Sequence, residues 1–295
     1  MVFDSLAGAV GNTPLVRLRS LEPGGVEIHA KLEWFNPGGS VKDRAGLQII
    51  RESVEKLRGR TLIDSTSGNT GIAYAWIGAA LRVPVALVMP ENVSEARKRI
   101  VRAFGVQVIY SDPLETSDGA IRLARQLVRE QPDRWFYADQ YSNEANPRAH
   151  ELGTAREIWD QTGGRVTHAV VGIGTGGTIM GVGRGLRARN RRVQIVAVEP
   201  AEALHGLEGL KHMPSSIVPA IYKESELDGK LSIPTDAGWD MAERLARDEG
   251  LFAGHSAGAA AFGAQLVARE IAERGETGVV VTLFPDRADR YIAPA

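Results

Sequence analysis

The chain has 295 residues, of which 43% are hydrophobic and 24% charged, a composition typical of one large globular unit or about two domains. Lys and Arg number 35 against 36 Asp and Glu, and this balance excludes the strongly basic footprint of a nucleic-acid-binding protein and gives no reason to expect an anionic membrane partner. No apolar run reaches the roughly 18 residues that span a bilayer, and the N-terminus lacks the basic start of a signal peptide, so we expect a cytoplasmic protein.

The residue types that are scarce exclude several kinds of chemistry. The chain contains no cysteine, which excludes disulfides, thiolate metal sites, iron–sulfur clusters and a cysteine nucleophile. None of the 6 histidines forms an H-x-x-x-H pair, the spacing that places two zinc ligands on one face of a helix. We therefore expect no metal site.

Short β-rich runs alternate along the chain with longer segments of helical periodicity, the pattern of βαβ units around a parallel sheet. Amphipathic spacing predicts helices at Ala120–Glu130 and Trp239–Glu249, and the polar segment Trp135–Asn146 interrupts the alternation where we expect the chain to cross between two domains. The sheets should be buried on both faces. In chain order the predicted strands are Glu27–Leu32, Thr61–Asp64, Val83–Met89, Gln107–Tyr110, Thr167–Val171, Gln194–Val198 and Gly278–Leu283.

Glycine-rich clusters precede several predicted helices, and all but the first follow a strand-like run. Loops at the carboxyl ends of parallel strands are where α/β proteins bind ligands, so these clusters are candidate ligand sites. In chain order they are Asn36–Arg44, Ser65–Gly71, Gly172–Thr178 and Gly254–Gly258.

Lys42 stands in the first cluster, at the start of a predicted helix, in a chain with only 7 lysines against 28 arginines. The positive end of a helix dipole disfavours a protonated amine, which favours a neutral nucleophile or a Schiff-base former. Taken alone, the pattern is better explained by an exposed first-turn lysine followed by Asp43 as a helix-start acid.

The second and fourth clusters also allow two interpretations each. Ser65–Gly71 offers small hydroxyls, an amide and backbone N–H groups that suit a carboxylate, and it also suits a plain helix N-cap. Ser256, taken alone, is explained as a helix N-cap as well. Gln140, His150 and His205 are, taken singly, explained as satisfied surface groups.

The third cluster is a candidate phosphate site, because N–H groups of a Gly-rich turn that opens a helix surround an anion. Gly172–Thr178 matches G-x-G-x-x-G, and Glu199 follows the next strand, as a dinucleotide site requires. NAD(P), another phosphate ligand and a turn without ligand all stay open. The hydroxyls of Thr175 and Thr178 suit a terminal phosphate better than a bridged pyrophosphate.

In combination, these segments resemble the cysteine synthase (O-acetylserine sulfhydrylase) family of fold-type II pyridoxal-phosphate-dependent enzymes, and within it the B-type. The resemblance follows the whole chain in order, through Gly11–Leu15, Lys31–Glu33, the Lys42 cluster, Met89–Asn92, Glu157–Trp159 and Asp286–Tyr291. It implies an α/β fold of two three-layer lobes with mostly parallel sheets and the active site in the cleft between them. Residues 36–145 with 1–11 would form the smaller lobe, and residues 146–295 with 12–35 the larger lobe that binds the cofactor phosphate.

The resemblance also implies roles for individual residues around pyridoxal 5'-phosphate. Lys42 would hold the cofactor as an internal aldimine and act as the general base, Asn69 would bond its phenolic oxygen, and Ser256 would face its pyridine nitrogen. The implied phosphate ligands are Gly174, Thr175, Gly176, Gly177 and Thr178. The implied substrate residues are Thr66, Ser67, Gly68, Thr70 and Gln140, with Lys211 at the active-site entrance.

The implied reaction is a β-replacement on an O-activated L-serine, either O-acetylserine or O-phosphoserine. Lys42 would take the α-proton, loss of the leaving group would give a bound aminoacrylate, and sulfide or thiosulfate would add to form cysteine or S-sulfocysteine. A hydroxyl at the pyridine nitrogen favours replacement over transamination. Cystathionine β-synthase-like or threonine/serine dehydratase chemistry is the alternative on this fold. An NAD(P)-dependent oxidoreductase and a non-catalytic binding protein are the alternatives of other classes.

The family further implies a homodimer that takes a small amino acid and a sulfur donor, with no nucleic-acid or membrane partner. Two departures from the family pattern stand out. Pro285 precedes Asp286 where B-type relatives often carry a cysteine, so thiosulfate chemistry that depends on such a thiol is in doubt. His150–Thr154 replaces a more Thr-rich stretch, and the sequence alone gives no account of it.

Overall fold

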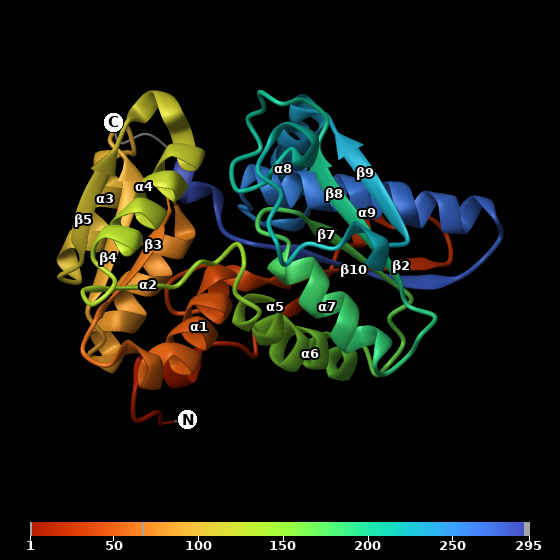
Figure 1. Ribbon diagram of the computed structural model, residues 1–295. Coiled ribbons are helices and arrows are strands. Elements are labelled where there is room, and N and C mark those ends of the chain that lie inside the picture. The colour runs from red at the N-terminus through yellow and green to blue at the C-terminus, as the bar shows by residue number, and fades with distance from the viewer. Residues whose placement is uncertain (1, 67, 292–295) are drawn as a thin grey trace. The chain divides into compact units, whose positions relative to one another are not determined.

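The computed structural model describes residues 2–66 and 68–291, and the chain divides into two compact units (Figure 1). The first unit comprises the chain up to Val10 together with Lys42–Asn146, and the second comprises Gly11–Val41 and the chain from Pro147 onward. Residues 36–41, which the sequence placed with the first lobe, belong here to the second unit. Their attachment explains this difference, because the Val41 N–H donates to the Pro285 carbonyl at 2.9 Å.

The first unit is built on a 4-stranded parallel sheet of order β5-β4-β3-β6. Its strands are β3 (Thr61–Ser65), β4 (Val85–Pro90), β5 (Gln107–Ser111) and β6 (Trp135–Tyr137). Its helices are α1 (Lys42–Leu57), α2 (Asn69–Leu81), α3 (Glu95–Ala103) and α4 (Thr116–Glu130). Helix α5 (Ala145–Ala149) begins in the first unit and continues into the second.

Alternate residues of β3 and β4 build two cores, one on each face of this sheet. Leu62 and Leu87 pack with the apolar side chains of α1 and α2, whereas Ile63 and Val88 pack with α4. Both faces are therefore covered, as the continuous apolar runs of these strands predicted. Burying one such aliphatic side chain contributes about 1.5–3 kcal/mol to folding.

The second unit is built on a 6-stranded sheet of order β1-β2-β10-β7-β8-β9, in which only the β1–β2 pair is antiparallel among the strands described. Its strands are β1 (Leu15–Arg17), β2 (Val26–Leu32), β7 (His168–Gly172), β8 (Gln194–Pro200), β9 (Gly229–Ile233) and β10 (Gly278–Phe284). Its helices are α6 (Ala155–Gln161), α7 (Gly177–Arg187), α8 (Thr235–Glu249) and α9 (His255–Glu273).

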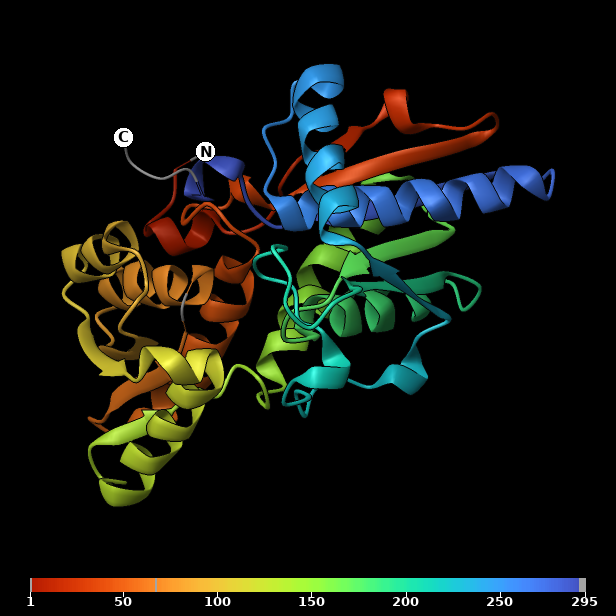
Figure 2. The same cartoon turned by 90° about the horizontal axis from the view of Figure 1, so that it is seen from above.

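The central strand β10 shows how this second sheet is covered on both faces. Val279 and Val281 pack with α6 and α7, while Val280 and Phe284 pack with α8 and α9. Helix α8 lies against the long helix α9, which runs along the sheet (Figure 2). The expected fold class, α/β units with mostly parallel sheets buried on both faces, is confirmed.

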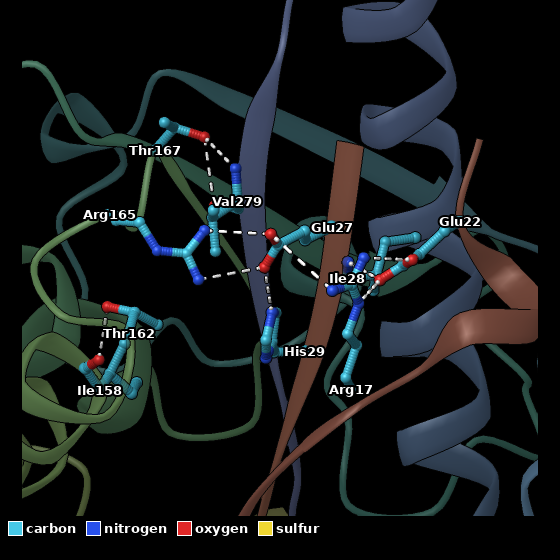
Figure 3. Close-up of polar contacts among 10 residues, drawn as sticks. All are labelled: Arg17, Glu22, Glu27, Ile28, His29, Ile158, Thr162, Arg165, Thr167 and Val279. Carbon is cyan, nitrogen blue, oxygen red and sulfur yellow. Dashed lines mark hydrogen bonds and ion pairs between the residues drawn. The ribbon is translucent and has the colours of Figure 1, made fainter. Parts of the chain in front are cut away.

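Charged side chains cluster at the edge formed by β1 and β2 (Figure 3). The Arg165 guanidinium donates to both carboxylate oxygens of Glu27 at 3.0 and 3.2 Å, and His29 Nε2 lies 3.0 Å from the same carboxylate. These contacts lower the pKa of Glu27 to about 2. Arg17 binds Glu22 through two contacts of 2.7 and 2.9 Å. Because surface pairs of this kind contribute about 0–1 kcal/mol each, the cluster adds little to the free energy of unfolding.

None of the helices within residues 2–66 and 68–291 is both long and apolar enough to cross a membrane.

Candidate active site

Lys42 is the first residue of α1 and is partly buried. It follows a turn in which the Gly39 N–H donates to the Asn36 carbonyl at 2.7 Å, Gly39 adopts a φ of +75°, and the Arg290 guanidinium donates to the Gly38 carbonyl. The next residue, Asp43, is buried and accepts a hydrogen bond from Trp76 Nε1 at 3.0 Å. The lysine is therefore held on a fixed helix start, and the alternative of an exposed first turn is wrong.

The loop between β3 and α2 folds around the Thr66 hydroxyl. Thr66 Oγ1 accepts the N–H groups of Gly68 at 3.3 Å and of Gly71 at 3.2 Å, and the Thr66 and Thr70 side chains are buried. A Cβ at Gly71 would lie 2.8 Å from Thr66 Cγ2, so the close approach requires glycine there. Asn69 opens α2, and Ser67 lies outside the described residues.

Gln140 joins this loop from the neighbouring strand. It follows β6, is only 3% exposed, and its Oε1 accepts from Thr70 Oγ1 at 2.8 Å while its Nε2 donates to the Ser65 carbonyl at 2.9 Å. The structure thus brings Gln140 together with Ser65, Thr66 and Thr70 in the first unit. The interpretation of Gln140 as a surface group is wrong.

Asp64 lies beneath the same loop, and the sequence did not single it out. It is fully buried at the end of β3, and burial raises the pKa of its carboxyl from 3.8 to about 7. The signal that could have found it is a carboxylate that ends an apolar strand directly before a hydroxyl-rich turn.

The cluster Gly172–Thr178 forms a sharp turn from β7 into α7. Gly176 adopts a φ of +86°, the Gly177 N–H donates to Thr175 Oγ1 at 3.3 Å, and a Cβ at Gly174 would lie 2.6 Å from the Gly209 carbonyl oxygen. The first N–H groups of a helix have no intrahelical partner and bind anions. Together with the hydroxyls of Thr175 and Thr178, this turn fits the phosphate group of pyridoxal phosphate.

Lys211 lies beside this turn in the second unit. Its backbone N–H donates to the Ile173 carbonyl at 2.8 Å, and Leu210 packs so closely over Gly172 that a Cβ there would lie 2.7 Å from Leu210 Cδ2. The structure therefore brings the backbone of Lys211 to the turn Gly172–Thr178, called the phosphate-type turn below, although the two are far apart in sequence.

His150 contributes to the same turn from a π-helical segment, His150–Thr154, that lies between α5 and α6. Its side chain is only 1% exposed, with Nδ1 3.0 Å from Thr154 Oγ1 and Nε2 3.3 Å from Thr178 Oγ1. The segment that departs from the family pattern thus contacts the first turn of α7. The surface-group interpretation is wrong for His150 as well, whereas His205 is partly buried.

Ser256 is the second residue of α9 and is buried. The strand-like run expected before its cluster is wrong, because Leu251–Ala253 contributes only one isolated bridge, between Ala253 and Arg287. The first unit contains Lys42 and the Ser65–Gly71 loop with Asn69. The second unit contains the phosphate-type turn, Lys211 and Ser256. The expected site in a cleft between two lobes stays a prediction.

Known proteins match this sequence over nearly its whole length. Residues 6–286 match the family model described as pyridoxal-phosphate dependent enzyme. The chain is 50% identical to a cysteine synthase of Aquifex aeolicus, covering 99% of this chain and 91% of that protein. It is 42% identical to cysteine synthase B of Pseudomonas aeruginosa, covering 99% and 96%.

A solved structure agrees with these relatives. O-acetyl serine sulfhydrylase isoform 3 from Entamoeba histolytica superposes with a TM-score of 0.93 at 35% identity, covering 100% of this chain and 91% of that one. The resemblance to cysteine synthases is therefore confirmed over the full length. The chain belongs to the family of pyridoxal-phosphate-dependent enzymes.

Proposed function

We propose that this protein is a cysteine synthase, which replaces the β-substituent of an O-activated L-serine with a sulfur nucleophile. The observation that carries the proposal is the full-length similarity to cysteine synthases combined with a lysine that opens α1 and a Gly-Thr turn that opens α7. An NAD(P)-dependent oxidoreductase would leave Lys42 and the Ser65–Gly71 loop without a role.

The residues of this chain fit pyridoxal 5'-phosphate in kind and number. Lys42 would hold the cofactor covalently through its amine, Asn69 would bond the phenolic oxygen, and Ser256 would face the pyridine nitrogen. The residues proposed for the phosphate are Gly174, Thr175, Gly176, Gly177 and Thr178. When bound, the cofactor supplies an electron sink that stabilises negative charge at the α-carbon of an amino acid.

The substrate is held by its carboxylate in this proposal. The residues assigned to that group are Thr66, Ser67, Gly68, Thr70 and Gln140, because N–H groups and hydroxyls are the donors that a carboxylate accepts. The Lys42 amine, when it is not bonded to the cofactor, would accept the proton from the α-carbon of the substrate. The same amine, now protonated, can return a proton to the product at the end of the replacement.

The test compares the wild-type protein with Lys42→Ala. The purified wild type should show the visible absorbance of a lysine-bound cofactor and should form cysteine from O-acetylserine and sulfide. Lys42→Ala should lose that absorbance and all turnover while keeping the wild-type circular dichroism, because it removes both the covalent link and the base. Turnover at the wild-type rate in Lys42→Ala would refute the proposal.

The proposal extends to assembly and place of action. We propose a homodimer in the cytoplasm that takes an activated serine and a sulfur donor as small-molecule substrates. Assays with O-acetylserine or O-phosphoserine, each paired with sulfide or thiosulfate, identify the physiological combination. Homocysteine in place of sulfide tests the cystathionine-forming alternative, and serine or threonine alone tests the dehydratase alternative.

A further inference from the structure

Asp64 is a buried carboxyl group that accepts hydrogen bonds from three elements of the first unit. Its side chain is 0% exposed. Oδ1 accepts the Ser65 N–H at 2.8 Å, and Oδ2 accepts both the Gln140 N–H at 3.1 Å and the Tyr74 hydroxyl at 3.0 Å. The contacts come from the end of β3, from the residue that follows β6 by three positions, and from α2.

The cost of this arrangement indicates that it has a use. Moving an isolated carboxyl group out of water costs several kcal/mol, and an apolar side chain would fill the same space without that cost. The pKa of about 7 at Asp64 reflects this cost, with desolvation as its main cause and hydrogen bonds from Ser65, Gln140 and Tyr74 opposing it. Tyr74, Tyr137 and Tyr141, whose pKa values are raised, and Asp139 are the titratable groups that interact with it.

What Asp64 joins is the pair of segments assigned above to the substrate carboxylate. The Ser65–Gly71 loop supplies hydroxyls and N–H groups, and Gln140 supplies an amide. The Gln140 side chain is already bonded to the loop, through the Ser65 carbonyl at 2.9 Å and Thr70 Oγ1 at 2.8 Å. Its carbonyl oxygen accepts from Asn146 Nδ2 at 2.8 Å, which fixes the other side of the residue. The hydrogen bonds to Asp64 also fix the backbone of Gln140 relative to the backbone of Ser65.

We propose that Asp64 is a positioning residue for recognition of the substrate carboxylate: it sets the backbone of Gln140 against the backbone of the Ser65–Gly71 loop. This inference rests on the proposed function, which assigns that loop and Gln140 to the substrate. Asp64 itself does not touch the substrate in this arrangement. Hydrogen-bond donors aimed at one ligand group lose much of their effect when their supporting contacts are lost, so the consequence should appear in carboxylate recognition.

The test uses two ligands that differ only in the carboxylate. The holoenzyme is titrated with L-serine and with ethanolamine, and the ratio of the two dissociation constants, read from the absorbance of the cofactor, measures the carboxylate preference. Asp64→Asn keeps the shape of the side chain but replaces one acceptor oxygen with a donor. We expect the preference to fall by about tenfold, while the affinity for ethanolamine changes by less than about twofold.

Tyr74→Phe is the matched control, because it removes one bond to Asp64 and leaves the contacts to Ser65 and Gln140 intact. Its carboxylate preference should stay within about twofold of the wild type. Asp64→Glu, which retains two acceptor oxygens, should recover part of the lost preference, and KM for O-acetylserine should follow the same order with kcat less affected. An unchanged preference in Asp64→Asn, or an equal loss in Tyr74→Phe, would overturn the inference.

A measurement on the wild-type holoenzyme covers the case in which Asp64→Asn does not fold. The backbone N–H groups of Ser65 and Gln140 both donate to the Asp64 carboxylate. A single local unfolding event that breaks these bonds should therefore expose both N–H groups to exchange with solvent. Their hydrogen-exchange protection factors, resolved by NMR, should agree within about threefold, and a difference above about tenfold would overturn the inference. If the wild type shows no carboxylate preference, the proposed function of this loop fails instead.

Discussion

Lys211 is the side chain for which we predict a role in substrate choice. Its backbone is anchored to Ile173 by a hydrogen bond of 2.8 Å, and the long loop of residues 201–228 carries it. A lysine is a mobile point charge that meets anionic groups, so it suits a phosphate leaving group or a thiosulfate donor.

We therefore expect Lys211→Ala to lower kcat/KM for O-phosphoserine or thiosulfate far more than for O-acetylserine with sulfide. A charge contact of this kind is worth about 1.5–3 kcal/mol, which corresponds to a loss of roughly 10- to 150-fold. Lys223 is an exposed lysine of the same loop, and Lys223→Ala is the control. It should leave kcat/KM unchanged for O-acetylserine and O-phosphoserine with either sulfide or thiosulfate. Equal losses for charged and neutral substrates would reduce Lys211 to a residue that orders the loop.

Asp64 also gives a pH dependence of stability whose sign follows from its pKa. Since the pKa is raised from 3.8 to about 7 on folding, the folded protein binds a proton that the unfolded chain releases between these values. The contribution of Asp64 to the free energy of unfolding is therefore fully present below about pH 4 and is lost as the pH rises to about 7.

Denaturant unfolding of the wild type and of Asp64→Asn at several pH values measures this contribution. The wild type should lose stability relative to the variant by on the order of a few kcal/mol between about pH 4 and pH 7, and the difference should be constant above pH 7. Parallel pH curves for the two proteins would mean that Asp64 does not titrate in this range.

At the scale of elements, α7 depends on glycines that let it lie close to the segment around the π-helical turn His150–Thr154. A Cβ at Gly185 would lie 2.5 Å from the Ala155 Cβ and 2.7 Å from the Glu151 carbonyl oxygen. The α7 helix carries Thr178, which His150 contacts at 3.3 Å, so this close packing also places the phosphate-type turn.

Gly185→Ala should destabilise the protein by about 1–3 kcal/mol, although alanine is favoured over glycine in a helix by up to about 1 kcal/mol. The reason is overpacking against backbone atoms that cannot move aside. Gly183→Ala in the same helix meets only the Ile195 side chain, at 3.3 Å, and should change the unfolding free energy by less than about 1 kcal/mol. Equal effects of the two substitutions in denaturant unfolding would contradict this account.

The sequence predicted the strands whose own residues identify them without reference to distant partners. β2, β3, β4, β5, β7, β8 and β10 all lie within about two residues of their predicted bounds, because aliphatic and β-branched residues are concentrated in them. β1, β6 and β9 were missed. β1 and β6 have only 3 residues each, and β9 alternates polar and apolar residues, so none of the three carries a long apolar run.

The residues of the candidate site also fall into those that the sequence predicted and those that it did not. Glycine clusters and Lys42 were visible in the sequence because turns and helix starts need particular residue types at fixed spacing. Asp64 was missed, and Gln140 and His150, taken singly, were interpreted as surface groups, because their burial depends on partners up to 76 residues away, such as the pairing of Asp64 with Gln140. Gln140 entered the predicted site only through the family resemblance.

At the scale of the whole molecule, the near-zero net charge of -1 offers little electrostatic opposition to self-association. Most soluble oligomers are closed homo-oligomers, with two-fold dimers the commonest. We expect sedimentation equilibrium at micromolar concentration to give the mass of two chains of 295 residues. A mass of one chain under these conditions would contradict the proposed homodimer.

The register of the second sheet has a consequence for the order in which the protein matures on the ribosome. β2, near the N-terminus, pairs with β10 from Val26 to Leu32 against Gly278 to Phe284. During synthesis β2 must therefore wait, with one edge open, until β10 has emerged. The first unit, by contrast, is nearly continuous from Lys42 to Asn146 and can complete its sheet before β7, β8, β9 and β10 have been made. The segment that leads into Lys42 reaches its final place only when Pro285 is available to Val41, so the helix start at Lys42 is completed later than the sheet of its own unit.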